Sequence, residues 1–96
     1  MAQYIMLANW TEQGIRNVKD SPGRLDAAKQ EWKKHGVEIT AFFMTMGRHD
    51  MVTILQAPSD EAVARVALAL GAAGNLRTET LKAFSEGEYR QIVQSL

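Results

Sequence analysis

The chain has no cysteine, only two prolines and no excess of either charge, because 11 basic side chains balance 11 acidic ones among 96 residues. The absence of cysteine excludes disulfides, thiolate metal ligands and a cysteine nucleophile, and it fits a reducing cytoplasm. The absence of a basic excess argues against nucleic acid as a partner, because a nucleic-acid-binding surface must neutralise phosphates.

Long hydrophobic runs are also absent. The N-terminal residues MAQYIMLANW have neither the basic start nor the apolar length of a signal peptide, and no segment approaches the length of a membrane span. We therefore expect a cytoplasmic protein without a membrane partner. Apolar residues make up 46% of the chain and charged residues 23%, which is typical of a globular protein. The length predicts a single domain over residues 1–96.

Four segments are apolar and β-prone, at residues 3–10, 37–46, 51–57 and 75–84. Two longer helices separate them and a short C-terminal helix follows, whereas residues 11–20 are predicted to form a connection. The element order is therefore β-α-β-β-α-β-α. This order predicts an α+β fold, a ferredoxin-like βαββαβ sandwich with an antiparallel four-stranded sheet and a C-terminal helix.

The helix boundaries follow from end signals. Ser21 is predicted as the N-cap of the first helix, with Gly36 at its end. The second helix opens within residues 58–61, and Gly71 is expected beyond its end. Residues 85–88, SEGE, have the pattern of a capping box before the terminal helix.

Both faces of the predicted sheet are apolar. A strand with one face in water should alternate apolar with polar residues, but the segment 37–46 has apolar side chains in both phases. These are Val37, Ile39, Ala41 and Phe43 in one phase, and Phe42, Met44 and Met46 in the other. Two helices cover one face only, and so much exposed apolar area exceeds the roughly 300–600 Å² patch of a monomer. We therefore predict a homodimer with sheet packed against sheet. The sequence also allows a higher homo-oligomer. In the alternative interpretation, the terminal helix covers the second face of the sheet.

The segment TMGRHDM, residues 45–51, joins the two central segments and has two interpretations. In the first, Gly47 permits a hairpin turn and Asp50 accepts hydrogen bonds from nearby N–H groups. In the second, Asp50 orients His49 as a general base, and the two are candidate catalytic residues. The other histidine, His35, lies in the last turn of the first predicted helix, where a cation favours the helix dipole. Two distant histidines do not form a metal site, so we predict no metal and no cofactor.

A polar cluster after the first predicted strand is a candidate ligand site. Its members are Asn9, Trp10, Thr11, Gln13, Arg16 and Asn17. An indole can stack on a flat ligand, while an amide and a guanidinium orient it. The candidate ligand-binding residues are Asn9, Trp10, Arg16 and, from the fourth strand, Arg77. In the alternative interpretation the cluster is an ordered loop and Trp10 belongs to the core.

Three ordered motifs resemble those of the GYD family of small bacterial and archaeal proteins. They are NWTEQGIRNVKDSPGRLDAAK at 9–29, MGRHDMVTILQAPSDEAVA at 46–64 and LALGAAGNLRTETLKAFSEGEYRQIV at 68–93. The family is named after a Gly-Tyr-Asp turn motif. The chain departs from it at His49, which stands where tyrosine is usual, so a phenol hydroxyl cannot be the general mechanism of this chain.

The resemblance implies a dimeric α/β barrel, in which two ferredoxin-like sheets face each other, and a functionally uncharacterised family. Its superfamily relatives include cofactor-independent monooxygenases, isomerases, haem enzymes and ligand sensors. The favoured hypothesis is a non-catalytic homodimeric module that binds a small ligand between sheet and helices, or only assembles. The alternative is a cofactor-independent enzyme, monooxygenase- or isomerase-like, in which His49 and Asp50 act as base. In that enzyme, Asn9, Trp10 and Arg77 would orient a planar substrate.

Overall fold

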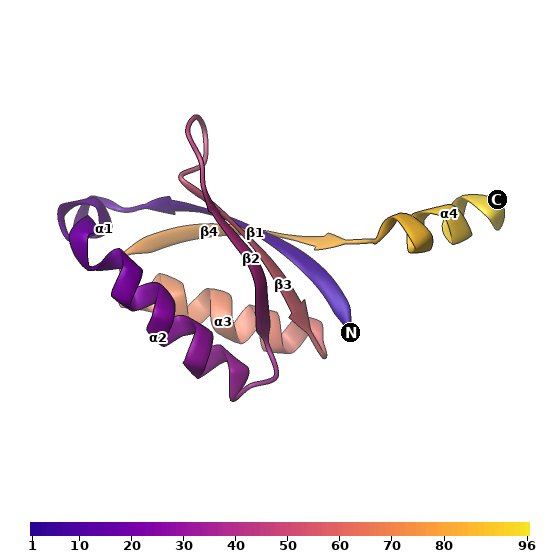
Figure 1. Cartoon of the computed structure of the whole chain (residues 1–96), viewed down its shortest axis with the longest axis horizontal. Coiled ribbons are helices and arrows are strands. Elements are labelled where there is room, and N and C mark those ends of the chain that lie inside the picture. Colours follow the sequence, from indigo (N-terminus) through magenta and orange to yellow (C-terminus); the bar gives the residue numbers. More distant parts are fainter.

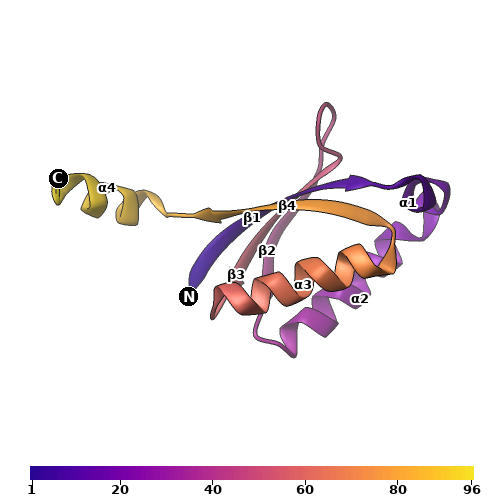
Figure 2. The same cartoon turned by 180° about the vertical axis from the view of Figure 1, so that it is seen from behind.

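The fold is built on one antiparallel sheet of four strands, and the computed structural model describes residues 1–96. The strands are β1 (Ala2–Trp10), β2 (Glu38–Met44), β3 (Met51–Ala57) and β4 (Leu76–Ala83), in the spatial order β2-β3-β1-β4. Helices α2 (Ser21–Lys33) and α3 (Asp60–Ala73) lie on the same face of the sheet (Figures 1 and 2). The predicted ferredoxin-like α+β fold is confirmed.

Three shorter helical elements complete the chain. A helix α1 (Glu12–Arg16) and a 3-10 turn η1 (Val18–Asp20) occupy the segment expected to be a connection. The C-terminal helix α4 (Glu86–Gln94) begins at the predicted capping box, in which Ser85 and Glu88 bond each other's backbone N–H groups. Helix α4 continues the line of β4 beyond the sheet and packs on neither of its faces (Figures 1 and 2). No helix combines the length and apolar character needed to cross a membrane.

The core lies between the sheet and the two long helices. Alternate residues of β1 and β3 point toward the helices and are buried, among them Met6 and Leu55. They pack against Trp32 of α2 and against Val63 and Val66 of α3. Because both phases of these strands are apolar, the sequence did not predict which phase faces the helices.

The opposite face of the sheet carries many apolar side chains and is not covered by any helix of the chain (Figure 2). We call it the open face. Cross-strand register places on it Ile5, Leu7, Ala41, Phe43, Val52, Ile54 and Leu81. Phe43 is 57% exposed and Leu81 is 42% exposed. The prediction that both faces carry apolar side chains is therefore confirmed, and the terminal helix does not cover the second one.

The structure corrects three details of the sequence interpretation. The second long helix does not stop before Gly71 but runs to Ala73, where Gly74 adopts a left-handed φ of 86° as C-cap. Ser21 is the first helical residue of α2 rather than its N-cap. A register shift in β2 between Ile39 and Ala41 turns Ile39 toward the helices while Ala41 faces away, so the two do not share a face as predicted.

Candidate functional site

A cavity of about 680 Å³ lies between the sheet and the two long helices. Hydrophobic residues form 16 of its 22 lining positions, and they come from all four strands, α2, the 3-10 turn η1 and the C-terminal half of α3. Cavities of roughly 300–1,000 Å³ that are mainly apolar, with a few convergent polar groups, are the usual form of small-molecule sites. This cavity is therefore the candidate functional site of the chain.

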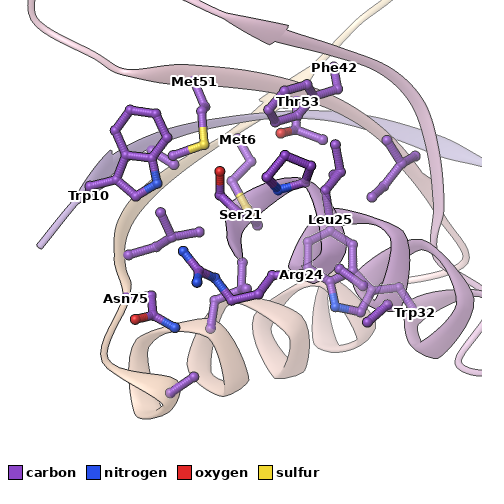
Figure 3. Close-up of a pocket in the computed structure, with 18 of the residues that line it drawn as sticks. Met6, Trp10, Ser21, Arg24, Leu25, Trp32, Phe42, Met51, Thr53 and Asn75 are labelled. Carbon is purple, nitrogen blue, oxygen red and sulfur yellow. The ribbon is translucent and has the colours of Figure 1, made fainter. Parts of the chain in front are cut away.

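Three aromatic side chains contribute to the cavity wall. Both tryptophans of the chain, Trp10 at the end of β1 and Trp32 near the end of α2, line it together with Phe42 of β2 (Figure 3). Trp32 is buried against the core, whereas Trp10 is partly exposed. Flat apolar side chains of this kind suit a ligand with a planar apolar body.

Few polar side chains line the cavity. They are Ser21, Arg24, Glu31, Thr53 and Asn75. Arg24 is the one basic residue among them and Glu31 the one acidic residue, and no histidine lines the cavity. The wall therefore offers a few hydrogen-bonding groups, one positive and one negative charge, but no imidazole for general acid–base catalysis.

The hairpin between β2 and β3 rises from the sheet on the side away from the helices (Figure 1). Its loop is closed by the Thr45 N–H, which donates to the carbonyl oxygen of Asp50 at 2.8 Å, and Gly47 has a left-handed φ of 115°. The carboxylate of Asp50 accepts a hydrogen bond from the backbone N–H of Trp10 at 3.0 Å. Asp50 thus ties the hairpin to the neighbouring strand β1, 40 residues away in the sequence, rather than bonding the N–H groups of its own turn as predicted.

His49 lies beside Asn9 at the base of the same hairpin. Its Nδ1 is 3.2 Å from Oδ1 of Asn9, whose amide nitrogen donates to the carbonyl oxygen of Arg48 at 2.8 Å. Arg77 pairs with Asn9 across the strands β1 and β4, on the open face. His49, Asp50, Asn9 and Arg77 therefore gather on the side of the sheet opposite the cavity.

The site residues predicted from the sequence do not all lie at the cavity. Trp10 lines the cavity, and Asn9, His49, Asp50 and Arg77 do not. The other predicted ligand-binding residue, Arg16, is an exposed residue of α1 outside the cavity. The five residues of the enzymatic hypothesis thus do not line one cavity within the single chain.

The rest of the polar cluster after β1 fixes the local backbone. The Thr11 hydroxyl caps α1 by accepting from the Gly14 N–H at 3.0 Å, and it donates to the carbonyl oxygen of Gly74. Gln13 donates to Oδ1 of Asn75 at 3.0 Å. These bonds attach α1 to the turn before β4, as expected in the interpretation of the cluster as an ordered loop.

Sequence reasoning missed Arg24 as a site residue, although one signal was available. Arg24 lies in the first turn of α2, which contains no acidic residue. A cation is disfavoured at a helix N-terminus, where the macrodipole attracts negative charge. The helix dipole therefore does not explain a basic residue at this position.

The ion pair at the opposite end of the sheet is separate from the cavity. Tyr4 of β1 donates a hydrogen bond to Asp60 at the start of α3, and Lys82 Nζ lies 3.3 Å from the same carboxylate. The bond from Tyr4, followed by the bond and charge of Lys82, lowers the pKa of Asp60 below its ordinary value of 3.8. The same bond, with burial, raises the pKa of Tyr4 to about 12. A hollow of about 230 Å³ adjoins these residues.

Known proteins resemble this chain over most of its length. Residues 4–93 match the GYD domain family. A Thermus thermophilus protein named "Glutamine synthetase and cystathionine beta-lyase binding protein" is 31% identical over 84 residues, which cover 86% of this chain and 88% of the relative. The crystal structure of TTHA0845 from Thermus thermophilus is similar in fold, with a TM-score of 0.55 and 21% identity. That match covers 88% of this chain and 95% of the other.

Proposed function

The chain is a member of the GYD domain family, and we propose that it serves as a non-catalytic, homodimeric module that binds a small ligand in the cavity between sheet and helices. The cavity itself carries the proposal, because it combines sufficient volume, an apolar aromatic wall and few polar groups. Ligand binding in the cavity does not require Asn9, Arg16 or Arg77, which lie outside its lining.

The chemistry of the lining supports binding over catalysis. The groups with the strongest claim to acid–base chemistry, His49 and Asp50, are engaged at the hairpin by Asn9 and by the Trp10 backbone. A general base must come within hydrogen-bond reach of the proton it takes. The enzymatic alternative would therefore need a substrate on the open face rather than in the cavity.

The open face supports the homodimer. Its apolar side chains would meet water in a single chain, and packing two open faces around a two-fold axis buries them. Helix α4 adds a second uncovered surface, because its apolar residues Tyr89, Ile92 and Val93 are each 46–60% exposed. In the dimer, the cavities of both chains stay on the outer, helix-covered sides.

A second candidate follows from the relative whose name describes binding to glutamine synthetase and cystathionine beta-lyase. Helix α4 is amphipathic and packs on nothing in its own chain, so it offers an apolar stripe to another protein. Co-elution with a purified glutamine synthetase, lost on combining Ile92→Asp with Val93→Asp, would support this candidate. Unchanged co-elution of that variant would remove α4 from it.

The small-ligand proposal is tested by a thermal-shift screen of small aromatic and aliphatic compounds. A compound that binds the folded state raises the melting temperature, and the fluorescence of Trp10 and Trp32 reports occupancy because both line the cavity. The variant Ala69→Phe places a ring at a lining position of α3, whereas Ala72 is an exposed residue of the same helix outside the lining.

We expect the compounds found in the screen to lose their effect in Ala69→Phe and to keep it in the control Ala72→Phe. The proposal fails if no compound stabilises the protein, or if Ala69→Phe responds like the wild type. Sedimentation or light scattering tests the homodimer independently, and a monomeric mass at micromolar concentration would refute that part.

A further inference from the structure

Three of the five polar side chains of the lining, including its basic one, gather toward one end of the cavity. The side chains of Ser21, Arg24 and Asn75 lie toward the end where α2 and β4 begin, whereas Trp32 and Phe42 lie toward the other end (Figure 3). An occupant that suits both ends must itself have a polar head and an apolar body.

Arg24 provides a positive charge at the polar end. One of its guanidinium nitrogens, Nη1, donates to the carbonyl oxygen of Asn17 at 3.1 Å, which holds the side chain in place. No carboxylate forms an ion pair with Arg24. A guanidinium has further N–H donors in a planar fork that matches a carboxylate, and these are available toward the cavity.

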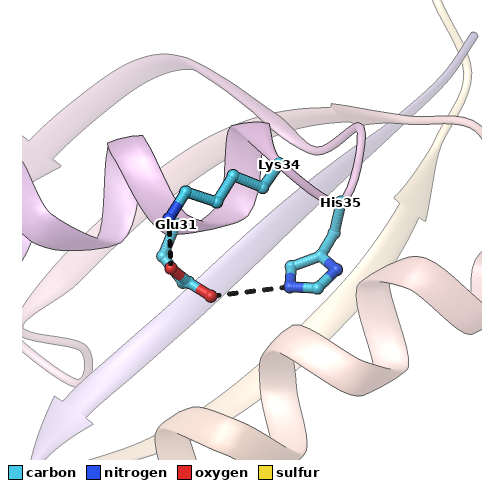
Figure 4. A network of polar contacts seen from close by, with 3 residues as sticks. All are labelled: Glu31, Lys34 and His35. Atoms are coloured by element: carbon cyan, nitrogen blue, oxygen red, sulfur yellow. Dashed lines mark hydrogen bonds and ion pairs between the residues drawn. The ribbon is translucent and has the colours of Figure 1, made fainter.

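Glu31, the acidic residue of the lining, does not neutralise Arg24. It lies seven positions later on α2, and its carboxylate is 3.4 Å from Lys34 Nζ and 3.6 Å from His35 Nε2 (Figure 4). Its charge is directed at these two partners near the end of the helix. The polar end of the cavity therefore keeps a net positive charge.

The neighbours of Arg24 add donors rather than acceptors. Oδ1 of Asn75 already accepts a hydrogen bond from Gln13, so the amide nitrogen of Asn75 is the group left for an occupant. Ser21 supplies a hydroxyl, and no acidic side chain lines this end of the cavity. With one basic side chain in the lining, the site balances a single negative charge rather than two.

We infer, resting on the proposed ligand-binding function, that the cavity takes a planar apolar molecule ending in one carboxylate. The carboxylate pairs with the guanidinium of Arg24 and accepts from Asn75, and the apolar body extends along Trp10 toward Trp32 and Phe42. Charge-assisted bonds to a fork-shaped donor fix the orientation of such a ligand.

The test compares 2-naphthoate with its neutral analogue 2-naphthalenemethanol by isothermal titration calorimetry on the full chain. For the wild type we expect naphthoate to bind at least about 10-fold more tightly than the alcohol, since charged hydrogen bonds are the strong ones. Arg24→Met keeps an apolar stem and should lose that preference while leaving the affinity for the alcohol within about 3-fold. Arg24→Lys should keep part of the preference.

Arg65→Met is the matched control, because Arg65 is an exposed arginine of α3 outside the cavity, and this variant should bind as the wild type does. Equal binding of both probes to the wild type and to Arg24→Met would overturn the carboxylate assignment but leave the ligand-binding function standing. Displacement of naphthoate by millimolar inorganic phosphate would reassign the polar end to phosphate-bearing ligands and also overturn it. If neither probe nor any screened compound binds, the proposed function fails and the inference falls with it.

Discussion

The hydroxyl of Tyr4 on β1 donates a hydrogen bond to the carboxylate of Asp60 in the first turn of α3. This bond connects the central strand to the helix that covers it, and it raises the pKa of Tyr4 from 10.0 to about 12. The folded state therefore holds the phenol proton more tightly than the unfolded state does. The stability it contributes is complete below pH 10 and is lost as the pH rises from 10 through 12.

We predict that Tyr4→Phe melts at a lower temperature than the wild type at pH 8, and that the difference shrinks as the pH rises from 10 to about 12. Asp60 acts at the other extreme, because its lowered pKa contributes stability that is present above pH 3.8 and is lost as the pH falls through the folded value. Thermal melts of both proteins from acidic to strongly alkaline pH measure both effects. A constant difference across the alkaline range would contradict the role given to Tyr4.

Gly14 is predicted to tolerate no side chain. A Cβ built there would collide with the carbonyl oxygen of Asn75, where α1 meets the turn before β4. We expect Gly14→Ala to lower the free energy of unfolding by about 3 kcal/mol, as for other substitutions that force backbone apart. The control is Gly23→Ala in α2, which meets nothing within 4 Å. It should stabilise the protein by about 0.5–1 kcal/mol, because alanine favours a helix over glycine. Urea denaturation measures both, and equal effects would refute the prediction.

Thr80 carries a buried hydroxyl without a hydrogen-bond partner. An unpaired buried hydroxyl costs free energy that a methyl group of similar size does not. We therefore predict that Thr80→Val raises the free energy of unfolding by about 1 kcal/mol, which is about 4–8 °C in melting temperature for a chain of this size. Thr40→Val is the comparison, because the Thr40 hydroxyl donates to Ile54 at 3.2 Å and its removal should give no gain.

The two hairpin residues Asp50 and His49 should differ sharply on substitution. Asp50→Ala removes the acceptor of the Trp10 N–H and should destabilise the protein by about 1–3 kcal/mol. His49→Ala removes one contact, with Asn9, and should cost less than about 0.5 kcal/mol. Chemical denaturation of both variants tests this. A larger decrease in the free energy of unfolding for His49→Ala would mean that the imidazole stabilises the hairpin more than its contacts indicate.

The fold was predictable because its signals are local. The β-prone composition of β1 and β3, the capping box at Ser85 and the hairpin glycine Gly47 each act over a few residues, and the structure reproduces all of them. The end of the second long helix was predicted wrongly because two nearby glycines could each end it. Gly71 and Gly74 are both plausible helix ends, and the left-handed backbone is found at Gly74.

The cavity was less predictable because it depends on how elements pack. Trp10 and Asn9 are neighbours in the sequence, but successive strand residues point to opposite faces, so Trp10 reaches the cavity and Asn9 the open face. Their positions on alternate faces of the strand contain this information, whereas grouping the cluster by polarity does not. Arg24 and Phe42 line the same cavity from different elements, so no spacing in the sequence joins them.

The open face provides the last prediction. Phe43 of β2 lies there with 57% of its surface exposed, beside Val52 of β3 in the cross-strand register. In the proposed dimer, a charge at this position would be buried without a partner, whereas in a monomer it would stay in water. Phe43→Asp should therefore convert the dimer to a monomer in sedimentation velocity while circular dichroism stays unchanged.

Leu68→Asp is the control, because Leu68 is 75% exposed on α3, away from the open face, and this variant should keep the dimeric mass. A dimer that survives Phe43→Asp would show that the chains associate through another surface, and the apolar stripe of α4 would be the next to substitute.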